Sequence, residues 1–189
     1  MMSRHWLSVT ACLLWFCYGC IGVSFAETST TPPSHILLEI PQVSLKGSGT
    51  YRWFGLSIYD ASLWTGPDGW SDQPKQKIAL DLRYARSLVG RKIADASVQE
   101  MEKLQLGSTT QRQQWLQQMT ALFPDVKEGT HITGIYVPNE TARFYLDGKL
   151  LGEIRDAEFA RAFFAIWLDQ HTSAPDLRKK LLGLTPPSH

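Results

Sequence analysis

Hydrophobic and polar residues follow two different periods along the chain. In residues 76–84 and 130–137 the apolar residues recur at every second position, which is typical of half-buried strands. The same period predicts a strand over residues 35–45, and Pro41 limits that strand to a sheet edge. The chain therefore contains at least three strands well separated in sequence.

Two hairpins add further strands. Residues 142–154 hold two alternating runs around Asp147 and Gly148, and an Asp-Gly pair supplies the positive φ angles of a tight hairpin turn. The stretch GSGTYRWFGLSIYDASLW, residues 47–64, predicts two strands that are divided near Gly55. In a continuous strand this stretch puts Arg52 on an apolar face and on the opposite side from Tyr59, so that the two could meet only if a turn or bulge at Gly55 resets the alternation.

Between residues 84 and 130 the period becomes helical. Ser87 is placed to cap a first helix that Gly107 ends, and a capping box of Ser108 and Gln111 begins a second helix that Pro124 ends. The apolar positions expected to face the core are Val89, Ile93, Ala96, Met101 and Leu104 in the first helix, and Trp115, Met119 and Leu122 in the second.

Two more helices follow the last hairpin. Asp156 and Glu158 place acid at the start of a helix so widely apolar that we expect it to be buried, and Pro175 begins a short final helix. Strands, two helices, a meander and two helices in that order predict an α+β fold with a largely antiparallel sheet.

The first 26 residues have the composition of a signal peptide. One basic residue, Arg4, precedes an apolar run that ends in small residues at Ser24 and Ala26, so we expect cleavage near Ala26 and a periplasmic or secreted mature protein without a stable membrane span. An uncleaved anchor and a lipoprotein modified at Cys20 are the alternatives. Residues 27–35 are rich in Ser, Thr and Pro and predict a disordered lead-in to one domain over residues 36–184.

Composition excludes several functions of the mature chain. All three cysteines lie in the leader, so the mature chain has no disulfide and no thiolate site. Loss of Arg4 from the 19 basic residues leaves 18 against 18 acidic ones, and this zero net charge argues against nucleic-acid binding. The four mature histidines, His35, His131, His171 and His189, lack ligand-like spacing, so we expect no metal and no cofactor.

Three segments of the sequence resemble the bacterial chalcone isomerase-like proteins. They are GSGTYRWFGLSIYDASLW, LRYARSLVGRKIADASVQEMEKL and FARAFFAIWLDQHTSAPDLRKKLLG, and they occur in the family's order over most of residues 40–183. The resemblance implies an open-faced β-sandwich, in which a large antiparallel sheet is covered on one face by helices, with a ligand cleft between sheet and helices. Plant members cyclise chalcones, whereas other members bind fatty acids.

The resemblance also implies a set of site residues. The arginine of the enzymes corresponds to Tyr51, with Arg52 one position later, their strand threonine corresponds to Tyr59, and a helical lysine corresponds to Lys92. Arg52 and Tyr59 are therefore the candidate catalytic residues, and Tyr51, Arg52, Tyr59 and Lys92 the candidate ligand-binding residues. The alternative is a purely structural role for Arg52, in a salt bridge to Asp60 or Asp81 or stacked on an aromatic ring.

Two substitutions argue against chalcone isomerase activity. The catalytic tyrosine and asparagine of the enzymes correspond to Val89 and Ala96, which cannot donate a hydrogen bond, with Tyr84 as a substitute donor. The leading hypothesis is therefore a non-enzymatic protein that binds a small hydrophobic or amphipathic molecule, such as a fatty acid. The alternatives are an isomerase or intramolecular lyase, and an envelope protein that binds an unknown protein partner through Trp64 and Trp70.

Overall fold

The computed structural model describes residues 31–71 and 74–184. The predicted signal peptide and residues 27–30 of the predicted lead-in lie outside these residues, whereas residues 31–35 of the lead-in lie within them. Within them, six strands form one sheet in which each strand pairs antiparallel with the next, from β1 at one edge to β6 at the other. The strands are β1 (Ser44–Trp53), β2 (Leu56–Thr65), β3 (Ile78–Tyr84), β4 (His131–Val137), β5 (Thr141–Leu146) and β6 (Lys149–Ile154).

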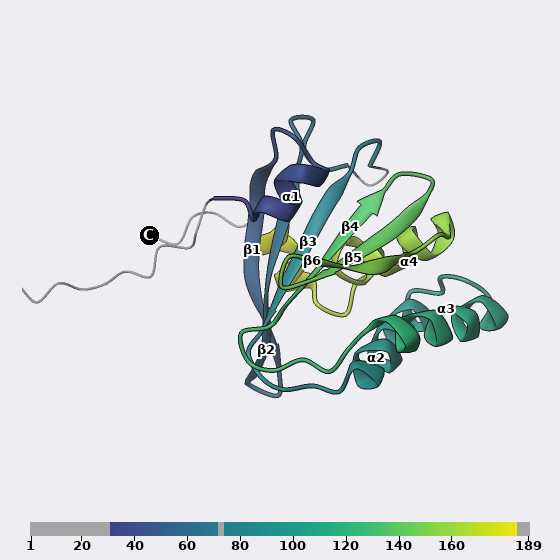
Figure 1. Ribbon diagram of the computed structural model, residues 1–189. Helices are drawn as coiled ribbons and strands as arrows, with labels where there is room; N and C mark the ends of the chain where they lie inside the picture. Colours follow the sequence, from purple (N-terminus) through teal and green to yellow (C-terminus); the bar gives the residue numbers. More distant parts are fainter. Residues whose placement is uncertain (1–30, 72–73, 185–189) are drawn as a thin grey trace, which may run out of the picture.

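Helices cover the sheet unequally (Figure 1). Four of them lie on its inner face: α2 (Gly90–Lys103), α3 (Thr109–Leu122), α4 (Ala157–Leu168) and α5 (Pro175–Leu181). A single short helix, α1 (Ser34–Glu39), lies on the outer face. This arrangement confirms the predicted α+β fold with an antiparallel sheet. None of the described helices is long and apolar enough to cross a bilayer.

An aromatic core joins α4 to the inner face of the sheet. Phe159 and Phe163 of α4 pack against Phe144 of β5, and all three are buried. The predicted acidic start of α4 is confirmed, because the Asp156 carboxylate accepts hydrogen bonds from two backbone N–H groups of its first turn. It also accepts one from the Trp115 indole at 2.8 Å, which ties α3 to α4.

One predicted turn and one predicted capping box have the expected geometry. Asp147 and Gly148 join β5 to β6 with φ angles of 47° and 81°. Ser108 and Gln111 cap α3 reciprocally, with Ser108 N donating to Gln111 Oε1 at 2.9 Å. Both features are local, which explains why sequence alone was sufficient to predict them.

The predicted strand over residues 35–45 is wrong at its first half. Residues 34–39 form α1, and the strand begins only at Ser44. Ile36 and Ile40 are two strand periods apart, but they are also four apart, which places them on one face of a helix. Both are buried against the outer face of the sheet, whereas Leu38, on the other side of the helix, is 85% exposed.

The helix expected from Ser87 begins later and turns a different face to the core. Leu88 pairs with Val126 in an isolated antiparallel bridge, so the chain stays extended until Gly90. The residues of α2 that are buried are Gly90, Ala94, Ser97 and Met101. Glycine is required at the first of these positions, because a Cβ there would lie 2.1 Å from the Phe123 carbonyl oxygen.

Candidate functional site

A groove of about 600 Å³ runs between the β1–β2 hairpin and the segment from Ser173 to Lys180, which contains α5. Helix α5 crosses β1 on the inner face, and Figure 1 shows it in yellow behind that strand. The apolar part of the groove wall consists of Tyr51, Trp53, Phe54, Ala174, Pro175 and Leu177. The groove is therefore largely aromatic on the hairpin side and aliphatic on the α5 side.

The hairpin beside the groove has two irregularities. Tyr51 pairs with Tyr59 but Arg52 pairs with Ser57, so the register shifts by one residue between Tyr51 and Arg52. The extra residue is Ile58 of β2, and the bulge therefore leaves the alternation of Tyr51 and Arg52 along β1 unchanged. At the end of the hairpin, Phe54 and Gly55 have φ angles of 46° and 79°, the geometry of a tight two-residue turn.

Two cations and one acid lie in this groove. Arg52 and Lys180 both line it, are exposed, and have no hydrogen-bond or ion-pair partner among the residues that the structure describes. Asp176 also lines it and lies 3.4 Å from the ammonium group of Lys179. The groove therefore presents an apolar wall beside two positive charges that are free to meet an anion.

The salt bridges that the sequence suggested for Arg52 do not form. Asp60 accepts a hydrogen bond from Thr50 at 2.7 Å and lies 3.7 Å from Arg83, while Asp81 is buried in a separate cluster. An ion pair with Asp60 or Asp81 therefore does not explain the arginine at position 52.

Tyr59 and Tyr84 lie behind Tyr51, which lines the groove. Tyr51 stacks on Tyr59 with ring centroids 5.1 Å apart, and Tyr59 meets the edge of Tyr84 at 6.0 Å. The Tyr59 hydroxyl accepts a hydrogen bond from the Trp167 indole at 2.9 Å, and burial raises its pKa well above its usual range. Burial likewise raises the pKa of Tyr84. Both hydroxyls consequently stay protonated at neutral pH and can act only as hydrogen-bonding groups.

Lys92 lies elsewhere. It is exposed on α2 and lines a second, shallower groove of about 380 Å³ between α2 and α3, together with Asp95 and Leu116. Val89 is 54% exposed and Ala96 is also exposed, so neither faces the inner surface of the sheet. Of the four predicted ligand-binding residues, Tyr51 and Arg52 line the groove, Tyr59 stacks on Tyr51 without lining it, and Lys92 lies beside the second groove.

The exposed aromatic residues are not the expected ones. Trp64, predicted as a partner-binding residue, is buried on the outer face of the sheet, and Trp70 is half-buried against the core. In contrast, Trp53 and Phe54 are 59% and 87% exposed. They lie at the turn of the hairpin, where none of the described helices covers them. This position could be predicted only if the register of the hairpin were known.

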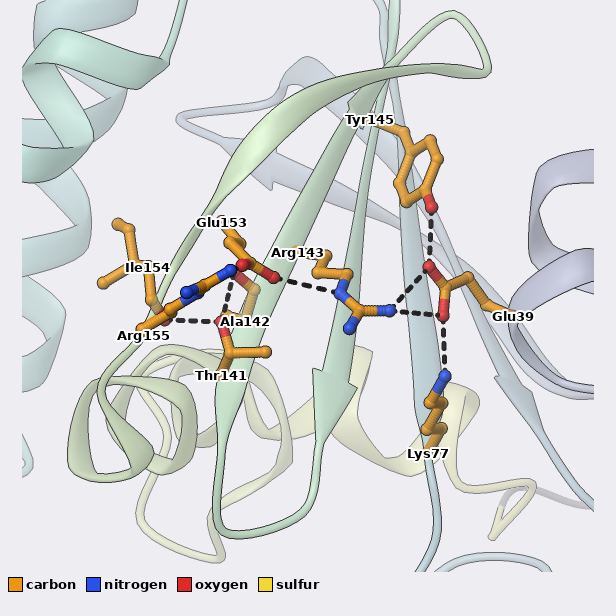
Figure 2. Close-up of polar contacts among 9 residues, drawn as sticks. All are labelled: Glu39, Lys77, Thr141, Ala142, Arg143, Tyr145, Glu153, Ile154 and Arg155. Atoms are coloured by element: carbon orange, nitrogen blue, oxygen red, sulfur yellow. Dashed lines mark hydrogen bonds and ion pairs between the residues drawn. The ribbon is translucent and has the colours of Figure 1, made fainter.

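A polar network on the outer face was missed entirely (Figure 2). Its centre is Glu39 of α1, whose side chain is only 10% exposed and accepts hydrogen bonds from Lys77, Arg143 and Tyr145. Arg143 also bonds to Glu153, which extends the network from β5 to β6. Because the sequence predicted a strand here, it gave no signal that Glu39 would meet β5 and the residue that precedes β3. The network fastens α1 to the sheet.

The network predicts a specific acid dependence of stability. Burial alone would raise the pKa of Glu39, but the hydrogen bonds from Lys77, Tyr145 and Arg143 lower it to about 2, from 4.5. A depressed carboxyl pKa stabilises the fold above pH 4.5, and this stability is lost as the pH falls from 4.5 towards 2.

Glu39→Gln should therefore lower the free energy of unfolding by about 2 kcal/mol at pH 7, less than the full pKa shift implies because Lys77 and Arg143 are partly screened by water. Urea unfolding at a series of pH values measures this. The difference between wild type and variant should shrink as the pH falls from 4.5 to 2, and a constant difference over that range would contradict the assignment.

A second buried polar chain lies beside the first. Thr133 donates to Asp81 at 2.6 Å, so its oxygen accepts from His35 at 2.9 Å, and His131 lies 2.8 Å from the other oxygen of Asp81. Burial lowers the pKa of His35, whereas the hydrogen bond to Asp81 raises the pKa of His131. Over the described part of the chain, no group of three or more potential ligands has the geometry of a metal site. These hydrogen-bonded side chains, like the Glu39 network, hold α1 in place on the face opposite the groove.

Comparison with known proteins identifies relatives of the chain. The family model described as chalcone isomerase-like matches residues 27–183. An uncharacterized protein of Haemophilus influenzae is 30% identical over 145 residues, which cover 76% of this chain and 69% of that protein. The match thus extends over nearly the whole described domain.

Solved structures include a close match in fold. The crystal structure of a fatty-acid binding protein of Arabidopsis thaliana superposes with a TM-score of 0.61 and 14% sequence identity, covering 75% of this chain and 87% of that protein. At this identity the likeness shows a shared fold, and the binding function named for that protein belongs to it alone.

Proposed function

Because the chain belongs to the chalcone isomerase-like family, we propose that it is a non-catalytic member that binds a small amphipathic anion, such as a fatty acid, in the groove between the β1–β2 hairpin and α5. The observation that carries this proposal is the combination in one groove of an aromatic and aliphatic wall with two unpartnered cations, Arg52 and Lys180. A protein of the same fold named as a fatty-acid binding protein supports it.

The size of the groove fits such a ligand, because small-molecule sites typically measure about 300–1,000 Å³. Its wall is about half apolar and half polar, which suits a molecule with an apolar tail and a charged head. The groove measures about 600 Å³, and its apolar side chains offer an acyl chain a contact surface that excludes water. Arg52 and Lys180 line the same groove, so one carboxylate can accept hydrogen bonds from one or both of them.

The same geometry favours binding over catalysis. Within the described residues, no histidine or cysteine lines the groove, and its one acid, Asp176, is exposed and lies beside Lys179. The hydroxyl of Tyr59 already accepts a hydrogen bond from Trp167, and its raised pKa prevents it from acting as a base. The residues at the family's tyrosine and asparagine positions, Val89 and Ala96, are exposed and apolar. The isomerase hypothesis would require donors that this groove does not supply.

We place this function outside the cytoplasm, on the basis of the signal-peptide composition of residues 1–26. One preparation tests location and ligand together. Protein isolated from the periplasmic or extracellular fraction should have the intact mass of a chain that begins at Glu27, and solvent extraction should release an amphipathic acid that mass spectrometry identifies.

Added hexadecanoic acid should also raise the melting temperature of the ligand-free protein, by more than hexadecanol does, because the alcohol lacks the negative charge. An empty protein whose melting temperature neither compound changes would overturn the proposed function.

A further inference from the structure

The tip of the β1–β2 hairpin exposes an unusual amount of apolar surface. Trp53, Phe54 and Leu56, which we call the hairpin tip, are 59%, 87% and 51% exposed. They are adjacent, and the rings of Trp53 and Phe54 meet edge to face with centroids 4.8 Å apart. Scattered exposed apolar residues are normal, but a contiguous aromatic group of this kind marks an interaction surface.

The backbone shows that the tip is not optimised for folding. Phe54 has a φ angle of 46°, a conformation that bulky side chains rarely adopt and that two-residue turns usually fill with asparagine or glycine. Phenylalanine at this position strains the turn and exposes a large ring to water, and the fold gains no buried contact in return. Such a residue indicates a function that needs the ring at the surface.

The charges around the tip have one predominant sign. From Arg52 to Tyr59 the chain contains one basic residue and no acid, and Lys180 of α5 adds a second cation beside the tip. Asp176 is the one acid among the groove residues, and it lies next to Lys179. Aromatic rings flanked by Lys and Arg are the composition that membrane interfaces favour, and basic residues are attracted to anionic lipid.

We propose that the hairpin tip docks on an anionic lipid bilayer, with Trp53, Phe54 and Leu56 in the interfacial layer and Arg52 and Lys180 against lipid phosphates. Because Trp53 and Phe54 also line the groove, the docked protein opens its groove directly onto the bilayer, from which the ligand is exchanged. The exchange step rests on the proposed function, whereas the docking does not.

Vesicle sedimentation tests the docking. The mature protein should sediment with vesicles that contain phosphatidylglycerol, sediment far less with pure phosphatidylcholine, and dissociate as salt is added. Leu56→Ser should weaken the partition about tenfold, because a leucine is lost from the interface. Leu150→Ser removes a leucine that is 61% exposed on β6, away from the tip, and should leave the partition unchanged.

Phe54→Asn separates docking from folding. Asparagine next to Gly55 suits the positive φ angles of the turn, so this variant should melt at a higher temperature than wild type and yet bind vesicles less well. Vesicle binding that is equal in wild type, Leu56→Ser and Phe54→Asn would overturn the proposal. So would self-association through the tip, seen by analytical ultracentrifugation, in a protein that does not bind vesicles.

The two proposals can fail separately. Leu56 does not line the groove, so Leu56→Ser should bind hexadecanoic acid in solution as tightly as wild type. A protein that binds hexadecanoic acid but no vesicles would refute the docking and leave the proposed function intact. A protein that binds vesicles through the tip but no hexadecanoic acid would refute the proposed function and leave the docking intact.

Discussion

Replacement of both Arg52 and Lys180 by alanine should weaken the binding of hexadecanoic acid by on the order of 100-fold. A hydrogen bond to a charged group contributes roughly 1.5–3 kcal/mol, and two such bonds at the lower limit, which suits exposed partners, give about 3 kcal/mol. The fold should be unaffected, because neither side chain has a hydrogen-bond or ion-pair partner among the described residues. Isothermal titration calorimetry, with thermal melting of each variant, measures both quantities.

Matched variants make this prediction specific. Arg91→Ala removes an exposed arginine from α2, outside both grooves, and should leave the affinity unchanged. Lys92→Ala distinguishes the two grooves, because the groove beside α5 predicts no change whereas the residue set inferred from sequence predicts a loss. If hexadecanol and hexadecanoic acid bind the double variant as they bind wild type, Arg52 and Lys180 are not the anchor.

Gly47→Ala should lower the free energy of unfolding by about 3 kcal/mol and weaken ligand binding as well. A Cβ at this position would lie 2.1 Å from the Lys180 carbonyl oxygen and 2.6 Å from that of Leu181. Both contacts are with backbone, so the last turn of α5 must move away from β1. Since α5 forms one wall of the groove, the shift should disturb the site as well as the fold.

Gly49→Ala is the matched control, two residues further along the same strand. Its added Cβ would meet the Lys180 side chain at 2.9 Å and the Leu177 side chain at 3.0 Å, and flexible side chains can give way where backbone cannot. We therefore expect a smaller loss than for Gly47→Ala in urea unfolding. Equal losses in the two variants would show that backbone contact between β1 and α5 is not what position 47 requires.

Local signals in the sequence predicted most of the elements correctly. The Asp147–Gly148 turn, the capping box at Ser108 and the acidic start of α4 depend on residues within a few positions of one another, and each has the expected geometry. The errors arose where a pattern had two interpretations. Ile36 and Ile40 satisfy both a strand period and a helix period, and only contact with the sheet selects the helix.

The candidate site was predictable only in part. Arg52 was identified because an arginine on an apolar strand face needs an explanation, and the structure places it in the wall of the groove. Lys180 was not identified, because its relation to Arg52 depends on how α5 crosses β1. Glu39 was missed for a similar reason, since its partners Lys77 and Arg143 are far from it in sequence.

A crystal structure of the protein with hexadecanoic acid would show directly whether Arg52 and Lys180 anchor the ligand in the groove beside α5. The carboxylate should lie within about 4 Å of the Arg52 guanidinium or the Lys180 ammonium group, the usual distance of an ion pair. The acyl chain should lie against Tyr51, Trp53 and Leu177. A ligand held between α2 and α3 beside Lys92, or a carboxylate remote from both Arg52 and Lys180, would contradict it.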